Sequence, residues 1–165
     1  GPLYHLTERT DRLRALAEAG RVTRPGGLIA GAVIGRHASL LDLARCGDLN
    51  RERLAMIMDT VATGRHDARI GFMATHFHTG SEAAAEFTAA GLIDPDVYGI
   101  EGPAWTAASA AARTPRGSAA RAGETVLTDE YAEAVFDSAL LVARAVERDP
   151  LMQPFSAHLL VSATA

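Results

Sequence analysis

Arg24-Pro25-Gly26-Gly27 leads into an apolar run, Leu28-Ile29-Ala30-Gly31-Ala32-Val33-Ile34, which is followed by Gly35-Arg36-His37. Pro25 sets φ for a turn, and Gly26 tolerates the positive φ that a type II turn requires at its third residue. Because the run is apolar throughout rather than alternating, it predicts a strand buried on both faces, as in parallel sheets covered by helices. In open α/β sheets ligands bind beyond the carboxyl ends of the strands, which directs attention to the three residues after the run.

Composition limits the class of protein. The chain has 165 residues, 48% of them hydrophobic, which suits one globular domain with a substantial core. Its net charge of −4 and its scattered basic residues, all 16 of them Arg, give no support to nucleic-acid binding. The exclusive use of Arg, together with abundant Ala and Gly, suggests a bacterial gene rich in G and C.

No segment of the sequence predicts membrane insertion or export. The apolar run is too short to cross a bilayer, and no signal peptide is recognised. The single cysteine, Cys46, excludes an intrachain disulfide and a cysteine-based zinc cluster. We therefore expect a cytoplasmic protein with no membrane partner.

Periodicity and capping signals around the run predict an α/β order. Helices are expected at 7–22, 37–45, 50–63, 79–90 and 128–148, and extended segments at 28–34, 72–78, 97–100 and 158–163. Residues 106–124 are typical of a linker or a loose helix. The last two strands have no crossover helix packed between them, so we expect an antiparallel pair at the sheet edge. The segments 36–75 and 103–157 are interpreted as helical insertions that cover a ligand pocket.

Individual residues mark the helix ends. Thr79 and Glu82 form a T-x-x-E capping box, and a Gly-Leu pair is placed to end that helix in a Schellman turn. In the first helix we expect Thr7 to cap the first turn, and Glu8 to pair with Arg12 at the solvated surface.

Several phrases of the chain, taken in order, resemble a known family. Gly1-Pro2-Leu3-Tyr4-His5-Leu6, an Arg-rich helix and Arg21-Val22-Thr23-Arg24-Pro25-Gly26-Gly27-Leu28 resemble the central part of bacterial class I S-adenosylmethionine-dependent methyltransferases. In that fold the second phrase joins the helix after the fourth strand to the fifth strand. The resemblance extends over nearly the whole chain, in the phrases Ile34–Asp42, Thr63–His66, Phe77–His78, Ala89–Leu92, Glu101–Trp105 and Ser156–Leu160.

The resemblance implies a fold, a cofactor and an activity. Residues 1–165 are expected to be the C-terminal half of a Rossmann-like methyltransferase sheet, with the first four strands and the glycine-rich cofactor loop lying upstream. The implied activity is transfer of a methyl group from S-adenosylmethionine to an O, N or S atom of a small molecule. This chain alone is expected to be inactive, and to pair with the missing half or with itself through the apolar edge of 28–34.

The candidate site residues follow in part from the resemblance and in part from their places after the expected strands. Leu3, Tyr4 and Leu6 are expected to contact the cofactor, because they follow the fourth strand beside the methyl end of S-adenosylmethionine. The candidate catalytic residues are Tyr4, His5 and His66. The candidate substrate-binding residues are Arg36, His37, His78, Glu101 and Trp105.

Alternatives stay open for several of these residues. Arg36 could clamp a carboxylate or hold an insertion by a salt bridge. His66 could be a base oriented by Asp67 or an exposed residue at a helix end. Trp105 could wall the substrate pocket or simply anchor an insertion to the core. His158, which opens the last strand, is interpreted as structural.

His76-Phe77-His78 permits a different class of protein. An H-x-H pattern on a strand places both imidazoles on one face, so His76 and His78 with Asp67 or Glu82 could form the metal site of a hydrolase. The spacing supplies no third ligand, so no metal is expected. A further alternative is a non-catalytic, truncated methyltransferase-like module that binds a partner.

Overall fold

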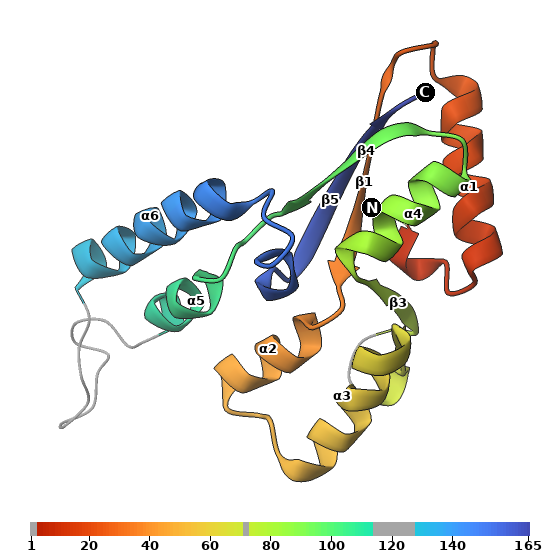
Figure 1. The fold of residues 1–165 in the computed structure, drawn as a ribbon. Coiled ribbons are helices and arrows are strands. Elements are labelled where there is room, and N and C mark those ends of the chain that lie inside the picture. Colours follow the sequence, from red (N-terminus) through yellow and green to blue (C-terminus); the bar gives the residue numbers. More distant parts are fainter. Residues whose placement is uncertain (1–2, 71–72, 114–127) are drawn as a thin grey trace.

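A computed structural model describes residues 3–70, 73–113 and 128–165, which form an α/β fold with a mixed, open sheet of five strands (Figure 1). The strands are β1 (Leu28–Gly35), β2 (Arg65–His66), β3 (Thr75–His78), β4 (Ile93–Gly99) and β5 (His158–Thr164). The α-helices are α1 (Arg9–Val22), α2 (Ala38–Cys46), α3 (Arg51–Thr63), α4 (Gly80–Ala89), α5 (Trp105–Arg113) and α6 (Asp129–Val146). Short 3-10 turns are η1 (Leu3–His5), η2 (Ala68–Ile70) and η4 (Gln153–Phe155).

The apolar run forms the central strand. The sheet order is β2-β3-β1-β5-β4, and β5 runs antiparallel to both of its neighbours, β1 and β4. The predicted antiparallel pairing of the last two strands is confirmed. On its other side β1 pairs in parallel with β3, but only at Ile34 and Gly35. The first six residues of β1 therefore have a strand partner on one side alone among the described residues.

The main core lies between the sheet and the helices α1 and α4 (Figure 1). Val33 of β1 and Val161 of β5 pack there with Leu16 of α1 and Phe87 of α4. Complete burial of one such side chain contributes about 1.5–3 kcal/mol, so this layer supplies much of the stability of the fold.

The opposite face of the sheet is less covered at the start of β1. Leu28 is 73% exposed and Ala30 is also exposed, whereas Ile34 at the other end of the strand is buried. The prediction that the run is buried on both faces is therefore wrong for its first half. The reason is tertiary: the core that α1 and α4 cover takes up Ile29 and Val33, whereas Leu28 and Ala30 on the alternate face are exposed.

The predicted ends of the helices are confirmed for α3 and α4. Thr79 and Glu82 complete both halves of the capping box of α4. Gly91, with φ of 87°, follows that helix, and the Leu92 amide donates to the carbonyl of Phe87 at 3.1 Å, as a Schellman turn requires. Gly64 ends α3 in the left-handed region that glycine adopts readily.

The start of α1 differs from the prediction. Glu8, rather than Thr7, is the N-cap residue, and its side chain makes no capping hydrogen bond. Arg12 is only 3% exposed, so it is not part of a solvated surface. Its NH1 group donates to the carbonyl oxygens of Leu6 at 2.8 Å and Thr7 at 2.9 Å, which ties η1 to the helix.

Two pairs of helices extend beyond the carboxyl end of β1 (Figure 1). The pair α2 and α3 follows β1 directly, and the pair α5 and α6 lies to one side of the sheet. Gly102 allows the second pair to approach closely, because a Cβ at this position, with φ of +66°, would lie 2.7 Å from the Cα of Ala143. The predicted loose segment 106–124 is helical to Arg113, and its remainder lies outside the described residues. Among those residues, no helix is long and apolar enough to cross a membrane.

Candidate functional site

A pocket with a volume of about 450 Å³ lies at the carboxyl end of β1, between α2 and α5. Its position is the one expected for a ligand site in an open α/β sheet. The pocket is lined by Ile34, Ala38, Ser39, Asp42, Leu43, Arg45, His66, Phe77, Glu101, Trp105, Ala157 and His158. We call it the β1-end pocket. Three of the predicted site residues, His66, Glu101 and Trp105, thus come together.

Tyr4 lies behind the lining of this pocket, in contact with residues that form its wall. The buried side chains of Ile34, Ala38 and Phe77 form a small cluster, and Tyr4 packs against it from η1. His5 is exposed beside it, with 4.4 Å between the two ring centroids. The predicted catalytic residues Tyr4 and His5 therefore lie next to the pocket wall rather than in a separate part of the fold.

The two predicted cofactor residues with aliphatic side chains differ in burial. Leu3 is buried in the main core, so its side chain is used for packing and only its backbone remains available to a cofactor. Leu6 is half-buried. Its carbonyl oxygen accepts the hydrogen bond from Arg12, which fixes the position of η1 relative to α1.

His66 is held in the wall of the pocket by an aromatic stack. Its ring lies 4.7 Å from that of Phe77, at 8° to it, and the residue is only 5% exposed. The alternative of an exposed histidine at a helix end is therefore wrong. Burial lowers the pKa of His66 below its ordinary value, against the opposing effect of the Asp67 charge, so the ring is neutral at pH 7.

Asp67 is directed to a different partner. Its carboxylate accepts hydrogen bonds from the backbone and the Nε of Arg69, each at 2.8 Å. These bonds lower the pKa of Asp67 to about 2. The expected orientation of His66 by Asp67 is therefore replaced by a local Asp67–Arg69 ion pair at the surface.

Glu101 and His158 form an ion pair in the opposite part of the pocket lining. The His158 Nδ1 lies 2.5 Å from the carboxylate, and the His158 backbone amide donates to the second oxygen at 2.9 Å. The carboxylate raises the pKa of His158. Burial alone would raise the pKa of Glu101, but the hydrogen bonds from His158 outweigh it and the pKa is lowered. No sequence pattern predicted that His158 belongs to this site.

Trp105 fills both of the roles that were considered for it. It lines the pocket, and its Nε1 donates to the carbonyl of Phe155 at 2.8 Å, which anchors α5 to η4. The guanidinium of Arg45 on α2 lies 5.3 Å from the centre of its ring. This cation–π contact connects the two helical segments across the pocket.

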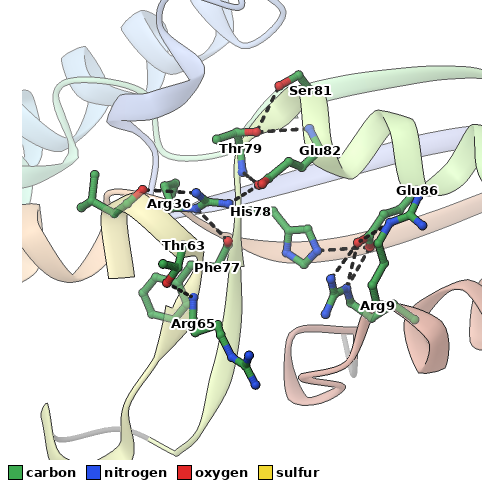
Figure 2. A network of polar contacts seen from close by, with 12 residues as sticks. Arg9, Arg36, Thr63, Arg65, Phe77, His78, Thr79, Ser81, Glu82 and Glu86 are labelled. Carbon is green, nitrogen blue, oxygen red and sulfur yellow. Dashed lines mark hydrogen bonds and ion pairs between the residues drawn. The ribbon is translucent and has the colours of Figure 1, made fainter. Parts of the chain in front are cut away.

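Arg36 does not point into the β1-end pocket. It is buried, and its Nε donates to the carbonyl of Phe77 at 2.9 Å while NH1 donates to that of Val61 at 3.2 Å. Its NH2 forms an ion pair with Glu82. Figure 2 shows this convergence, in which one side chain joins β1, β3, α3 and α4. All three nitrogens serve the fold, so the prediction of Arg36 as a substrate clamp is replaced by its structural alternative.

His37 and His78 line a different, smaller pocket of about 250 Å³ that includes Arg36 and the start of α4. His37 is the N-cap residue of α2, and burial followed by the nearby Arg36 charge lowers its pKa. The predicted substrate residues therefore fall into two groups at the carboxyl end of β1. One group faces the space between the helical segments, and the other faces α4.

His78 belongs to a buried polar network that sequence reasoning missed (Figure 2). Its Nε2 lies 3.3 Å from Glu86, whose carboxylate receives two hydrogen bonds from the Arg12 Nε, at 2.9 and 3.1 Å. Arg9 lies at 3.9 Å from the same carboxylate. Burial alone would raise the pKa of Glu86, but the bonds from His78 and Arg12 lower it to about 2. Since Arg12 and Glu86 are 74 positions apart, no local pattern predicts their pairing.

The H-x-H pair keeps its expected geometry without gaining a third ligand. The rings of His76 and His78 meet edge to face, with 4.5 Å between centroids. Within 3–70, 73–113 and 128–165, no group of three or more His, Cys, Asp or Glu side chains could hold a metal ion. Burial, with smaller effects of His78 and Arg12, lowers the pKa of His76 to about 4.

Fold and site together define an α/β domain with a mixed open sheet and a ligand-sized pocket at the carboxyl end of its central strand. Comparisons with protein-family models, with curated proteins and with solved structures found no match to this chain. The function is therefore argued from the residues and from the geometry of the pocket.

Proposed function

We propose that this chain is the C-terminal half of a Rossmann-like, S-adenosylmethionine-dependent methyltransferase, and that the β1-end pocket holds the methyl acceptor. One observation carries the proposal. The candidate site residues His66, Glu101 and Trp105 line one pocket, and Tyr4 packs against a buried cluster whose members line the same pocket. They come from three separate parts of the sequence, so their meeting is a property of the fold.

The edge of β1 supports the proposed half-sheet. The resemblance makes β1 the fifth strand, whose second neighbour would be the fourth strand. From Leu28 to Val33 that side of β1 carries no described partner strand, and the side chain of Leu28 is exposed. An apolar strand with an open edge is a pairing site. We propose that the missing half of the sheet, or a second copy of the chain, pairs there.

The residues of this chain would serve a methyl transfer by positioning and by proton removal. S-adenosylmethionine, when bound, supplies a sulfonium-linked methyl group that is open to in-line attack. Tyr4 and His5 on η1 fit the place beside that group, because η1 holds them at the pocket wall. His66 is neutral at pH 7, so it can take up a proton from the acceptor as the new bond forms.

An interaction module without catalysis remains the second candidate, and the open edge of β1 favours it equally. The hydrolase alternative has less support, since the Nε2 of His78 already contacts Glu86, whose carboxylate is also bonded to Arg12. For the methyltransferase and for the interaction module we propose a cytoplasmic place of action, in keeping with the single cysteine.

The test is a methyl-transfer assay on the gene product that includes whatever the reading frame encodes before Gly1. Labelled S-adenosylmethionine is offered with a panel of phenols, amines and thiols. We expect transfer to at least one acceptor, and a loss of about 10²–10⁴-fold in kcat for His66→Gln. Arg53→Gln, an exposed change on α3, serves as the control and should retain full activity. Absence of transfer to every acceptor would favour the interaction module.

A binding measurement with S-adenosylhomocysteine on residues 1–165 alone tests whether this chain holds only part of the cofactor site or all of it. Isothermal titration should detect no binding in the micromolar range, because the proposed cofactor cradle lies mainly outside this chain. Tight binding by the isolated chain would contradict the proposed division of the fold.

A further inference from the structure

The β1-end pocket has aromatic side chains in its lining from two distant parts of the sequence. Phe77 comes from β3 and Trp105 from α5, and Ile34, Ala38 and Leu43 complete a mostly apolar wall. Apolar pockets with a few placed polar groups are typical of sites for small organic molecules. A volume of about 450 Å³ is ample for one or two rings.

Trp105 presents a preorganised surface. Its indole nitrogen is anchored to the carbonyl of Phe155 at 2.8 Å, and the Arg45 guanidinium lies 5.3 Å from the centre of the ring. Phe77 is similarly fixed by its stack with His66. Because Trp105 is already held in place and is partly exposed, its ring loses little conformational freedom on binding and favours a flat partner that can stack on it.

The charges in the pocket lining compensate one another. Asp42 is paired with Arg45, and Glu101 is paired with His158. His66 is kept neutral by burial. The lining therefore offers hydrogen-bonding groups but no uncompensated charge, and this selects against a strongly charged ligand.

We propose that the β1-end pocket binds an uncharged, flat aromatic molecule that carries a hydroxyl group. The identification of this molecule as the methyl acceptor rests on the proposed function, whereas its binding does not. The hydroxyl of such a molecule can form a hydrogen bond with His66 or with the Glu101–His158 pair. The aromatic ring supplies the apolar surface that contacts the rest of the wall.

Trp105 makes the proposal directly testable, because it is the only tryptophan of the chain. Its fluorescence is measured while the full chain is titrated with 4-nitrophenol, an absorbing phenol, at a mildly acidic pH where this phenol is uncharged. Free N-acetyltryptophanamide is the optical control. We expect saturable quenching of the protein alone. Phenol should then displace the probe and restore the fluorescence, whereas cyclohexanol, its saturated counterpart, should not.

Two variants locate the binding, since Trp105 also lines a neighbouring pocket of about 390 Å³ beside Phe136. Ser39→Leu introduces a larger side chain into the β1-end pocket and should weaken binding by about tenfold or more. Phe136→Ser changes only the neighbouring pocket, at a position that is 61% exposed, and should leave binding unchanged. Circular dichroism verifies that both variants are folded.

Three results would overturn the proposal: equal displacement by cyclohexanol, loss of binding in Phe136→Ser, or absence of saturable quenching. If the phenol binds but the complete gene product transfers no methyl group, the pocket assignment stands and the proposed function fails. If methyl transfer occurs only to acceptors without an aromatic ring, the proposed function stands and the assignment of the pocket to an aromatic ligand fails.

Discussion

The central strand β1 lies between a closed region, on the side of α1 and α4, and an open region at its two ends. On the α1 and α4 side, its residues pack into a closed core, and the side chains of Arg12 and His78 there both bond to the Glu86 carboxylate. Beyond its carboxyl end, two pairs of helices leave a pocket, and at its beginning Leu28 and Ala30 remain exposed. The closed region consists of side chains that pack on one another, whereas the open region presents a pocket for a ligand and an unpaired strand edge for a partner strand.

In this fold the buried arginine side chains stabilise the core, and a less buried arginine lines the pocket. Arg36 and Arg12 are the buried arginines of the described residues, and both are committed to internal partners. Arg45, in contrast, lies in the pocket lining over an aromatic ring. The arginine that directly follows β1 in the sequence, Arg36, is therefore the structural one, and the arginine at the pocket, Arg45, lies on the next helix.

The largest expected effect comes from breaking the closed region at Arg12. Arg12→Met leaves the Glu86 carboxylate buried without its main partner, which should lower the free energy of unfolding by about 3–5 kcal/mol. Urea denaturation measures the change. Glu86→Leu added to Arg12→Met should recover part of the loss, because it removes the uncompensated charge.

Arg14→Met is the matched control, since this residue lies on the same helix with its side chain 85% exposed. It should change stability by no more than about 0.5 kcal/mol. A loss of under about 1 kcal/mol for Arg12→Met would mean that the network contributes little to folding.

The next effect concerns the open region at the start of β1. The isolated chain should self-associate through the unpaired edge, and Ala30→Lys should suppress this by placing a charge there. Ala30 is opposite Ser162 in the register with β5, so Ser162→Lys adds the same charge within the sheet rather than at its edge. Sedimentation velocity compares the three proteins.

We expect Ser162→Lys to retain more association than Ala30→Lys, because edge pairing uses the backbone of β1. A wild-type chain that is cleanly monomeric at high concentration would contradict the proposed pairing edge.

A smaller effect is expected at the capping box of α4, which borders the closed core. Thr79→Ala removes the side-chain acceptor of the Glu82 amide and should cost about 1 kcal/mol. Thr88→Ala, a Thr-to-Ala change at an exposed position of the same helix, should cost nothing. Thermal unfolding of both variants distinguishes loss of the cap from a general change in helix propensity, and equal losses would argue against the cap.

The smallest effect tests the pocket side through pH. His158 has a raised pKa in the folded protein, so its pairing with Glu101 stabilises fully below the ordinary value of 6.5 and is lost as pH rises through the folded pKa. Glu101→Gln should therefore destabilise more at about pH 5.5 than at about pH 8.5, by under about 1 kcal/mol because the pair is partly exposed.

Urea denaturation at the two pH values measures this difference. Glu18→Gln, at a surface pair with Arg21, is the control and should show no such pH dependence in this range. A larger loss at the alkaline pH would mean that the Glu101–His158 pair does not carry the proton-linked stability.

Much of the local structure could be predicted from the sequence, for reasons that are themselves local. The Thr79–Glu82 box, the glycines that end helices and the apolar run from Leu28 to Ile34 each depend on neighbouring residues. The antiparallel last pair of strands was also predictable, because the chain between them offers no crossover helix of the usual kind.

The candidate site was only partly predictable. His66, Glu101 and Trp105 were identified, but the partners that fix their chemistry were not. Phe77 stacks on His66, His158 pairs with Glu101, and Arg45 covers Trp105. None of these partners stands at a spacing that a helix or strand would bring together by itself.

By itself, then, the sequence determined most of the helices, the ends of α3 and α4, and the presence of the apolar strand that begins at Leu28. Only the tertiary structure decided that Arg12 is buried with Glu86, that Arg36 serves the fold, and that the first half of the strand is covered on one face. The physical reason is distance along the chain. Capping and periodicity act over a few residues, whereas burial and charge pairing depend on which distant segments the fold brings into contact.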